Sequence, residues 1–248
     1  MAIPEGFGRG RRSAGGIPGV IFLLLALAVP AVAAEPQTVS LMTRDGVQIT
    51  ASLFLPDKHP APAVVLLHMM TRSRHDWDAA AQKLVDAGIA ALSVDFRRAG
   101  QPQTDAKGGD DLADLVLDVE AARAYLTARP EIAPSRIGIA GASVGANVAV
   151  IAAGNDASVR SLALLSPSLE YRNLRIEAAL KKFGSRPALL VASSEDPYAL
   201  RSARGMVGMG DGPRELRVLS GAGHGTVMLS RDSDLVTALV DWFVRTLL

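Results

Sequence analysis

The pentapeptide Gly141–Gly145, with the sequence GASVG, places one serine between two glycines. A largely apolar stretch, Arg136–Ala140, precedes it and an Ala- and Val-rich stretch, Val144–Ala153, follows it, so the serine is expected at a strand–turn–helix junction. Such a turn lifts the hydroxyl above the sheet, and the glycines let neighbouring backbone come close. The helix that follows points its first amides at the same place, where negative charge develops during acyl transfer. The motif therefore predicts Ser143 as a nucleophile.

A serine hydroxyl is a poor nucleophile until a neighbouring base removes its proton. The chain has four histidines, His59, His68, His75 and His224. His224 lies in the sequence Gly-Ala-Gly-His-Gly, between an expected strand and the last expected helix, where a solvent-reachable imidazole can approach Ser143. His59 lies in a proline-rich loop that is expected at the surface. We therefore expect His224 to be the base.

The third group of such a site is a carboxylate that fixes the histidine tautomer and stabilises the imidazolium. Asp196 fits this role, because it lies in a loop directly after the apolar stretch 189–192 and precedes the histidine in the chain. Glu195, one position earlier, remains open as a rival. Asp95 also follows an expected strand, but its Asp-Phe-Arg-Arg run is expected to form a salt-bridged turn.

The elements that must position these residues alternate between short apolar runs and amphipathic stretches. Two extended runs, 38–43 and 47–55, flank Arg-Asp-Gly and predict an antiparallel hairpin. Further strands are expected at 63–67, 89–94, 136–140, 159–165, 187–192 and 215–219, and helices at 76–87, 110–128, 144–153, 176–183, 198–207 and 232–247. In the first of these helices Asp76, beside His75, is the expected N-cap. We predict an α/β fold with a mostly parallel, doubly wound sheet, the N-terminal hairpin and no large lid, in one domain over residues 35–248.

The first 34 residues resemble a secretory signal. Three arginines precede an apolar run from Val20 to Val29, and small residues follow up to Ala34. We predict a cleavable signal peptide over residues 1–34 and a periplasmic or secreted mature protein with no stable membrane partner. An uncleaved membrane anchor and export by the twin-arginine route remain alternatives.

Composition narrows the possible partners. Cleavage after Ala34 would leave 23 basic and 24 acidic side chains, a balance that gives no electrostatic case for a nucleic-acid partner. The chain has no cysteine, which excludes disulfides. No cluster of His, Asp and Glu has metal-ligand spacing, and no glycine-rich phosphate cradle opens a helix, so no metal or cofactor is expected.

In the order of elbow serine, loop aspartate and Gly-His-Gly, residues 38–248 resemble the α/β-hydrolase superfamily, and the lid-poor layout is similar to its dienelactone-hydrolase-like branch. The resemblance implies hydrolysis of ester, thioester or related acyl bonds through an acyl-enzyme. Ser143 would be the nucleophile, His224 the base and then the acid, and Asp196 the orienting group. Dienelactone hydrolases proper usually carry a cysteine nucleophile, so the serine indicates a carboxylesterase-like enzyme (EC 3.1.1).

The resemblance also implies an oxyanion hole. One donor is the amide of Val144, the residue after the nucleophile, and the other comes from the loop after the early strand. Many relatives have His-Gly at the start of that loop, whereas this chain has His68-Met69. Met70 is then the expected second donor, with Met69 as an alternative. His68 itself is expected to be a buried, hydrogen-bonded loop residue.

The substrate is expected to be a small ester or another acyl compound. Met69 and Tyr171 are candidates for an apolar acyl site, although ordinary packing explains them as well. Four arginines could face an anionic leaving group: Arg72, Arg74, Arg97 and Arg98. Two alternatives to a hydrolase of esters stay open, namely an acyltransferase or peptidase with the same triad, and an exported binding protein that has lost catalysis.

Overall fold

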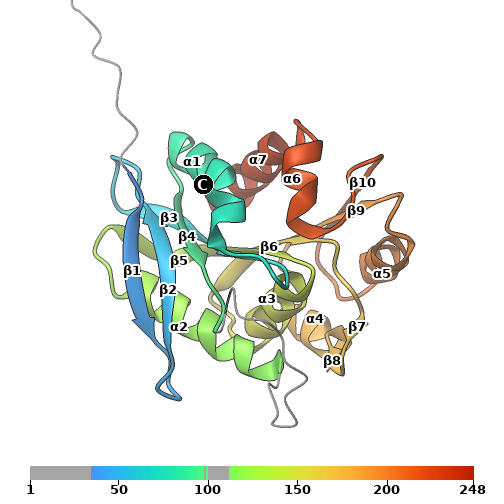
Figure 1. Ribbon diagram of the computed structural model, residues 1–248, viewed down its shortest axis with the longest axis horizontal. Helices are drawn as coiled ribbons and strands as arrows, with labels where there is room; N and C mark the ends of the chain where they lie inside the picture. Colours follow the sequence, from blue (N-terminus) through green and yellow to red (C-terminus); the bar gives the residue numbers. More distant parts are fainter. Residues whose placement is uncertain (1–34, 98, 100–111) are drawn as a thin grey trace, which may run out of the picture. The chain divides into compact units, whose positions relative to one another are not determined.

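The computed structural model describes residues 35–97, 99 and 112–248 (Figure 1). Its main sheet has eight strands in the order β1-β2-β4-β3-β5-β6-β9-β10. These strands are β1 Gln37–Met42, β2 Gln48–Phe54, β3 Ala61–Leu67, β4 Ala90–Val94, β5 Ile132–Ala142, β6 Val159–Leu165, β9 Ala188–Ser193 and β10 Arg214–Leu219. The hairpin β1–β2 is antiparallel, β2 is antiparallel to β4, and every pairing from β4 to β10 is parallel. The predicted sheet is confirmed.

Helices cover both faces of this sheet, as Figure 1 shows. They are α1 Asp78–Asp86, α2 Leu115–Thr127, α3 Val144–Asn155, α4 Glu177–Phe183, α5 Pro197–Val207, α6 Met228–Arg231 and α7 Leu235–Leu247. Every residue of β3 is buried, because alternate side chains enter opposite layers. Val65 and Leu67 pack with residues of α2 to α5, whereas Val64 and Leu66 pack with residues of α1, α6 and α7. The sheet is therefore doubly wound.

The helix predicted over residues 76–87 begins differently from the prediction. A short 3-10 turn, η1 Arg74–Trp77, leads into α1, and Asp76 does not cap it. Instead the Asp76 carboxylate accepts a hydrogen bond from the Thr226 hydroxyl. The N-cap prediction was wrong because this partner lies 150 residues away in the chain and leaves no local signal.

Salt bridges hold Asp95 and Arg97, which follow β4, and they correct one prediction. The Arg97 guanidinium, only 13% exposed, pairs with Asp45 at 2.7 Å and with the fully buried Asp118 at 2.9 Å. Arg97 therefore cannot face an anionic leaving group. Burial raises the pKa of Asp118, although the hydrogen bonds from Arg97 oppose this shift. Arg74 is engaged in the same way by Asp95, so the expected salt-bridged turn is present.

Several sequence predictions fall on residues that the structure does not describe. The predicted signal peptide, Arg98 and the start of the helix predicted at residue 110 lie outside the described residues. Among the residues that are described, no helix is both long enough and apolar enough to span a bilayer.

Candidate active site

Ser143 lies in the turn between β5 and α3. Its backbone has φ 54° and ψ −117°, a conformation that a non-glycine residue adopts at a cost of about 1–3 kcal/mol and that concentrates at functional sites. The turn is held from both sides. The Ser143 amide donates to the Leu165 carbonyl at 2.8 Å, and the Ser143 carbonyl accepts from the amides of Ala146 and Asn147 at 2.9 and 3.2 Å. The strand–turn–helix context predicted from the sequence is therefore present.

The two glycines of the motif are required by close backbone contacts. A Cβ atom on Gly141 would lie 2.3 Å from the Gly145 carbonyl oxygen. A Cβ atom on Gly145 would lie 2.6 Å from the His68 carbonyl oxygen and 2.7 Å from that of Leu67. The first turn of α3 thus touches the loop after β3. This contact places the loop that carries Met69 and Met70 directly beside the serine turn.

Three side chains from separate loops form a continuous hydrogen-bonded chain at this end of the sheet. Ser143 Oγ lies 2.8 Å from His224 Nε2, and His224 Nδ1 lies 2.5 Å from Asp196 Oδ2. An ionised carboxylate only accepts, so the proton of the neutral imidazole belongs on Nδ1 and the lone pair on Nε2 faces the serine hydroxyl. The His224 side chain is 48% exposed, whereas that of Asp196 is 15% exposed. The histidine can therefore exchange protons with a bound substrate or water.

Asp196 is fixed by its position at the start of α5. Its Oδ1 atom accepts from the amide of Ala199 at 3.1 Å, so the residue is the N-cap of this helix, and Pro197 occupies the first helical position. The same carboxylate thus caps a helix through one oxygen and holds the imidazole through the other. This double engagement restricts its rotamer.

Glu195, the rival acid, is engaged elsewhere. Its carboxylate accepts hydrogen bonds from the Ser193 hydroxyl at 2.5 Å, the Ser194 hydroxyl at 2.9 Å and the Gly221 amide at 2.7 Å. These hydrogen bonds, that from Ser193 being the strongest influence, lower the pKa of Glu195 to about 2. The geometry therefore brings Asp196, and not Glu195, to the histidine.

The segment that follows His224 is held by Ser166 and Asp76, and neither contact was predicted from the sequence. The Gly225 amide donates to the Ser166 hydroxyl at 3.0 Å, and the Thr226 hydroxyl donates to Asp76. Ser166 directly follows β6 and has a positive φ of 48°. Its position directly after an expected strand, 159–165, was the only sequence signal for such a role.

The candidate oxyanion donors lie on the two segments that meet at Gly145. Val144 is the first residue of α3, where an amide has no partner within the helix. Met70 lies in a tight turn in which the Arg72 amide donates to the Met69 carbonyl at 3.3 Å, and Thr71 has a φ of 61°. Positive φ at a β-branched residue is strained, so this loop carries strain next to the serine turn.

His68 is a structural residue, as predicted. Its side chain is 96% buried, Nε2 accepts from the Phe96 amide at 3.1 Å, and Nδ1 donates to the Met69 carbonyl at 2.7 Å. Burial lowers the pKa of His68, which keeps the ring neutral and both of these bonds intact. His68 thereby ties the loop after β3 to the loop after β4.

The two candidate substrate residues lie in different surroundings. The Met69 sulfur packs against Gly225, 2.4 Å from where a Cβ atom on that glycine would lie. Met69 therefore supports the histidine loop. Tyr171 is half-buried in a small hairpin formed by β7 Glu170–Tyr171 and β8 Leu174–Arg175. This hairpin is joined to the start of α5 by a hydrogen bond from the Tyr198 hydroxyl to the Glu170 carbonyl at 2.7 Å.

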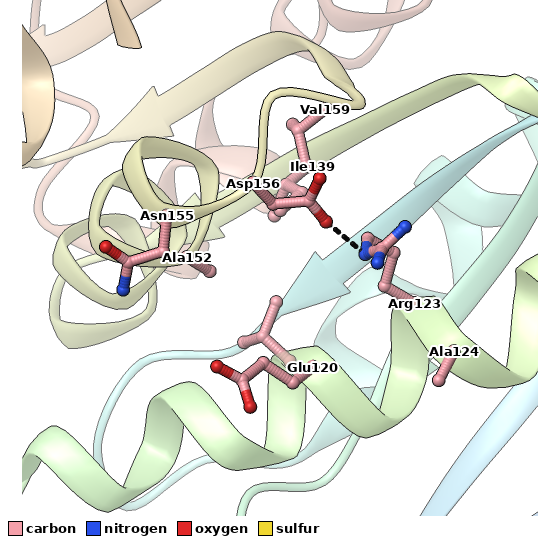
Figure 2. Close-up of a pocket in the computed structure, with 9 residues that line it drawn as sticks. Glu120, Arg123, Ala124, Ile139, Ala152, Asn155, Asp156 and Val159 are labelled. Atoms are coloured by element: carbon pink, nitrogen blue, oxygen red, sulfur yellow. Dashed lines mark ion pairs between the residues drawn. The ribbon is translucent and has the colours of Figure 1, made fainter. Parts of the chain in front are cut away.

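A crevice of about 450 Å³ lies between α2 and α3, away from these loops (Figure 2). Its floor is apolar, and Arg123 and Asp156 form an ion pair across it. Asn155, at the far end of α3 from Ser143, lines it, and a helix of this length spans about 18 Å. The crevice is therefore separate from the candidate active site. Within the described part of the chain, no three potential ligand side chains gather as a metal site requires.

Comparison with known proteins places this geometry in a family. A protein-family model described as serine aminopeptidase, S33, matches residues 58–232. The chain belongs to this family. The match includes the serine turn, Asp196 and His224, and it makes the chain a member of the α/β-hydrolase superfamily, as the sequence resemblance predicted.

Solved structures of other α/β hydrolases share the fold. The dienelactone hydrolase from Anabaena variabilis is similar with a TM-score of 0.72 and 20% identity, over 87% of this chain and 100% of that one. An esterase domain from a Rhodothermus marinus protein is similar with a TM-score of 0.67 and 21% identity, over 86% of this chain and 100% of that one. At these identities the likeness concerns the fold alone.

Curated relatives are longer than this chain. Two proteins of Mycobacterium tuberculosis, from strains CDC 1551 / Oshkosh and ATCC 25618 / H37Rv, are 29% identical to it over 204 residues. The alignment covers 80% of this chain but only 44% of the length of either relative. Both relatives carry a provisional name as phosphoribosyl transferases, and that name describes the longer proteins.

Proposed function

We propose that this α/β hydrolase cleaves carboxylic-ester or similar acyl bonds through an acyl-enzyme on Ser143, with His224 as the base and Asp196 as the group that orients it. The observation that carries the proposal is the unbroken chain of hydrogen bonds from Ser143 Oγ through His224 to Asp196. A hydroxyl held 2.8 Å from an imidazole nitrogen that faces it is within reach for proton transfer.

The reaction follows from this arrangement. Ser143 Oγ attacks the acyl carbon while His224 Nε2 takes its proton. The negative charge on the former carbonyl oxygen is stabilised by amides, for which Val144 and Met70 are the proposed donors. The bond to the leaving group then breaks as His224 returns the proton to the leaving atom. Water repeats these steps on the acyl-enzyme, and free Ser143 is regenerated.

Cleavage beside a free amine is the second candidate, because the matching family is described as an aminopeptidase. Binding of a substrate ammonium requires an available carboxylate. Among the described residues of the loops around the serine, Asp76 accepts from Thr226, Asp95 pairs with Arg74, and Glu195 accepts from Gly221. Their engagement with protein donors favours an ester substrate over an aminoacyl one.

The test compares purified wild-type protein with Ser143→Ala on p-nitrophenyl acetate, p-nitrophenyl butyrate and an aminoacyl p-nitroanilide. We expect turnover of the esters that disappears in the variant and little turnover of the anilide. Faster cleavage of the anilide than of the esters would favour aminopeptidase activity over ester hydrolysis. An increase in ester consumption with added alcohols, with the new ester as product, would indicate an acyltransferase. No turnover by folded wild-type protein would favour a binding protein without catalysis.

We also propose that the protein is exported. The support is the sequence of residues 1–34, in which three arginines precede an apolar run and small residues. Expression of the full chain in a Gram-negative host, followed by N-terminal sequencing of the periplasmic fraction, tests this. A mature protein that begins at Glu35 is expected, whereas an intact chain in the membrane fraction would indicate an anchor.

A further inference from the structure

We propose that Glu195 is a positioning residue for His224. By fixing the entry to the histidine loop, its carboxylate keeps the imidazole in line with both Ser143 and Asp196. The proposal rests on the serine-hydrolase function proposed above.

The histidine loop needs such a partner because glycines dominate it. Gly221, Gly223 and Gly225 all have positive φ values, of 69°, 80° and 60°. Glycine loses more conformational freedom on ordering than any other residue, so this loop is costly to hold in one geometry. At Gly221 no neighbouring atom lies within 4 Å of where a Cβ atom would be. No side chain therefore packs against Gly221 on that side, and its backbone is held by polar contacts, while the next residue, Ala222, is buried in the core.

Glu195 holds the backbone amides of two successive residues at the start of the histidine loop, Gly221 directly and Ala222 through Ser193. Its Oε2 atom accepts directly from the Gly221 amide at 2.7 Å. The same atom accepts the hydroxyl proton of the buried Ser193 at 2.5 Å, which leaves a lone pair of that hydroxyl for the Ala222 amide at 3.2 Å. Because a hydroxyl has one proton, the carboxylate decides how Ser193 is oriented. Both bonds therefore depend on Glu195.

The location of Glu195 gives this clamp its effect on the triad. Glu195 precedes Asp196 in the chain, so one short segment holds both the start of the histidine loop and the carboxylate that receives His224. The other side of the loop is held separately, through the Gly225 amide on Ser166 and the Thr226 hydroxyl on Asp76. With both sides fixed, the short bond between His224 and Asp196 is kept in register. Without Glu195, one side of the loop would be released.

The test uses Glu195→Ala, which removes the accepting oxygens, together with Ser193→Ala, the double variant and the control Ser194→Ala. The control removes a hydroxyl that donates to Glu195 at 2.9 Å, but leaves the bonds to Gly221 and Ala222 in place. A misplacement of about 1 Å can reduce turnover about 100-fold, and release of one side of the loop should cost about 10-fold in kcat. We expect this loss in Glu195→Ala and Ser193→Ala with little change in KM. In the double variant the loss should be smaller than the product of the two, because both act on one network.

A spectroscopic readout separates positioning from general stability. In proton NMR the His224 Nδ1 proton, bound to Asp196, should give a low-field resonance in the wild type and in Ser194→Ala, and a broadened or lost one in Glu195→Ala. An unchanged resonance and unchanged kcat in Glu195→Ala would overturn the proposal. If Glu195→Ala does not fold, the same two measurements on Ser193→Ala decide. The NMR result stands even if no ester is cleaved, so failure of the proposed function is recognised separately.

Discussion

Replacement of Gly145 by alanine should damage catalysis through a backbone clash. The new Cβ atom would lie 2.6 Å from the His68 carbonyl oxygen, about 0.8 Å inside the 3.4 Å at which ordinary contact begins. Neither side can yield cheaply, because both are backbone. Overpacking typically costs about 1–3 kcal/mol, and the better helix propensity of alanine returns about 1 kcal/mol. The clash should push the loop that carries Met70 away from Ser143.

The chain offers a matched control on the same helix. A Cβ atom on Gly154, near the other end of α3, would lie 2.6 Å from the Ala179 carbonyl oxygen. Gly154→Ala therefore imposes a clash of equal size at a distance from the serine. Both variants should lose a few degrees in Tm, since 1 kcal/mol corresponds to about 2–4 °C for a domain of this size.

The assay is steady-state hydrolysis of p-nitrophenyl acetate, with thermal unfolding measured in parallel. Loss of one oxyanion donor typically lowers kcat about 10²–10³-fold. We expect a loss of about 100-fold in Gly145→Ala and a kcat close to that of the wild type in Gly154→Ala. Equal kcat values in the two variants would refute the argument that contact between α3 and the loop after β3 builds the site.

Three further predictions concern stability. Arg97→Met should lower the free energy of unfolding by about 3–5 kcal/mol, measured by urea denaturation. The reason is that the buried Asp118 carboxylate loses its ion-pair partner and keeps only the hydrogen bond from the backbone amide of residue 97. The preference between neutral and anionic esters should not change. Asp45 and Glu195 have pKa values of about 2 in the folded protein, below those of the unfolded chain. Between about pH 4.5 and pH 2 the unfolded state therefore binds more protons, and the free energy of unfolding should decrease as the pH is lowered through this range. A shallower fall in Asp45→Asn and Glu195→Gln than in the wild type checks this. Arg186→Met should cost about 3 kcal/mol in the urea experiment, because Arg186 donates to the carbonyls of Ala153, Asp156, Val159 and Phe183; an unchanged midpoint would contradict this role.

Local sequence was sufficient to predict the serine turn and most of the strands. Short apolar runs such as that of β3 are continuous because both faces of the sheet are covered, and the glycines around Ser143 reflect contacts within a few ångströms. Strand β5 was predicted too short. It begins at Ile132 because the ladder with β3 is irregular between Ala61 and Ala63, which allows Pro134 within the strand.

Contacts between distant residues could not be predicted in this way. The residue type and position of Asp76 are typical of a helix N-cap, but its carboxylate accepts a hydrogen bond from Thr226. Arg97 was expected to be an exposed cation, but it forms ion pairs with Asp45 and Asp118. The sequence also did not show which of the two adjacent acids, Glu195 or Asp196, binds the histidine, because both carry a carboxylate. Their roles depend on which side chain meets the histidine and which meets the Gly221 amide, and only the folded arrangement of β9 and β10 decides that.

The most direct test of the central claim is covalent labelling of Ser143. Purified protein and Ser143→Ala would be treated with a fluorophosphonate probe, digested and mapped by mass spectrometry. The account predicts one modified peptide, with the adduct on Ser143, that is absent from the variant and forms more slowly while an ester substrate is present in excess. No adduct on folded wild-type protein, or an adduct on another residue that persists in Ser143→Ala, would contradict it.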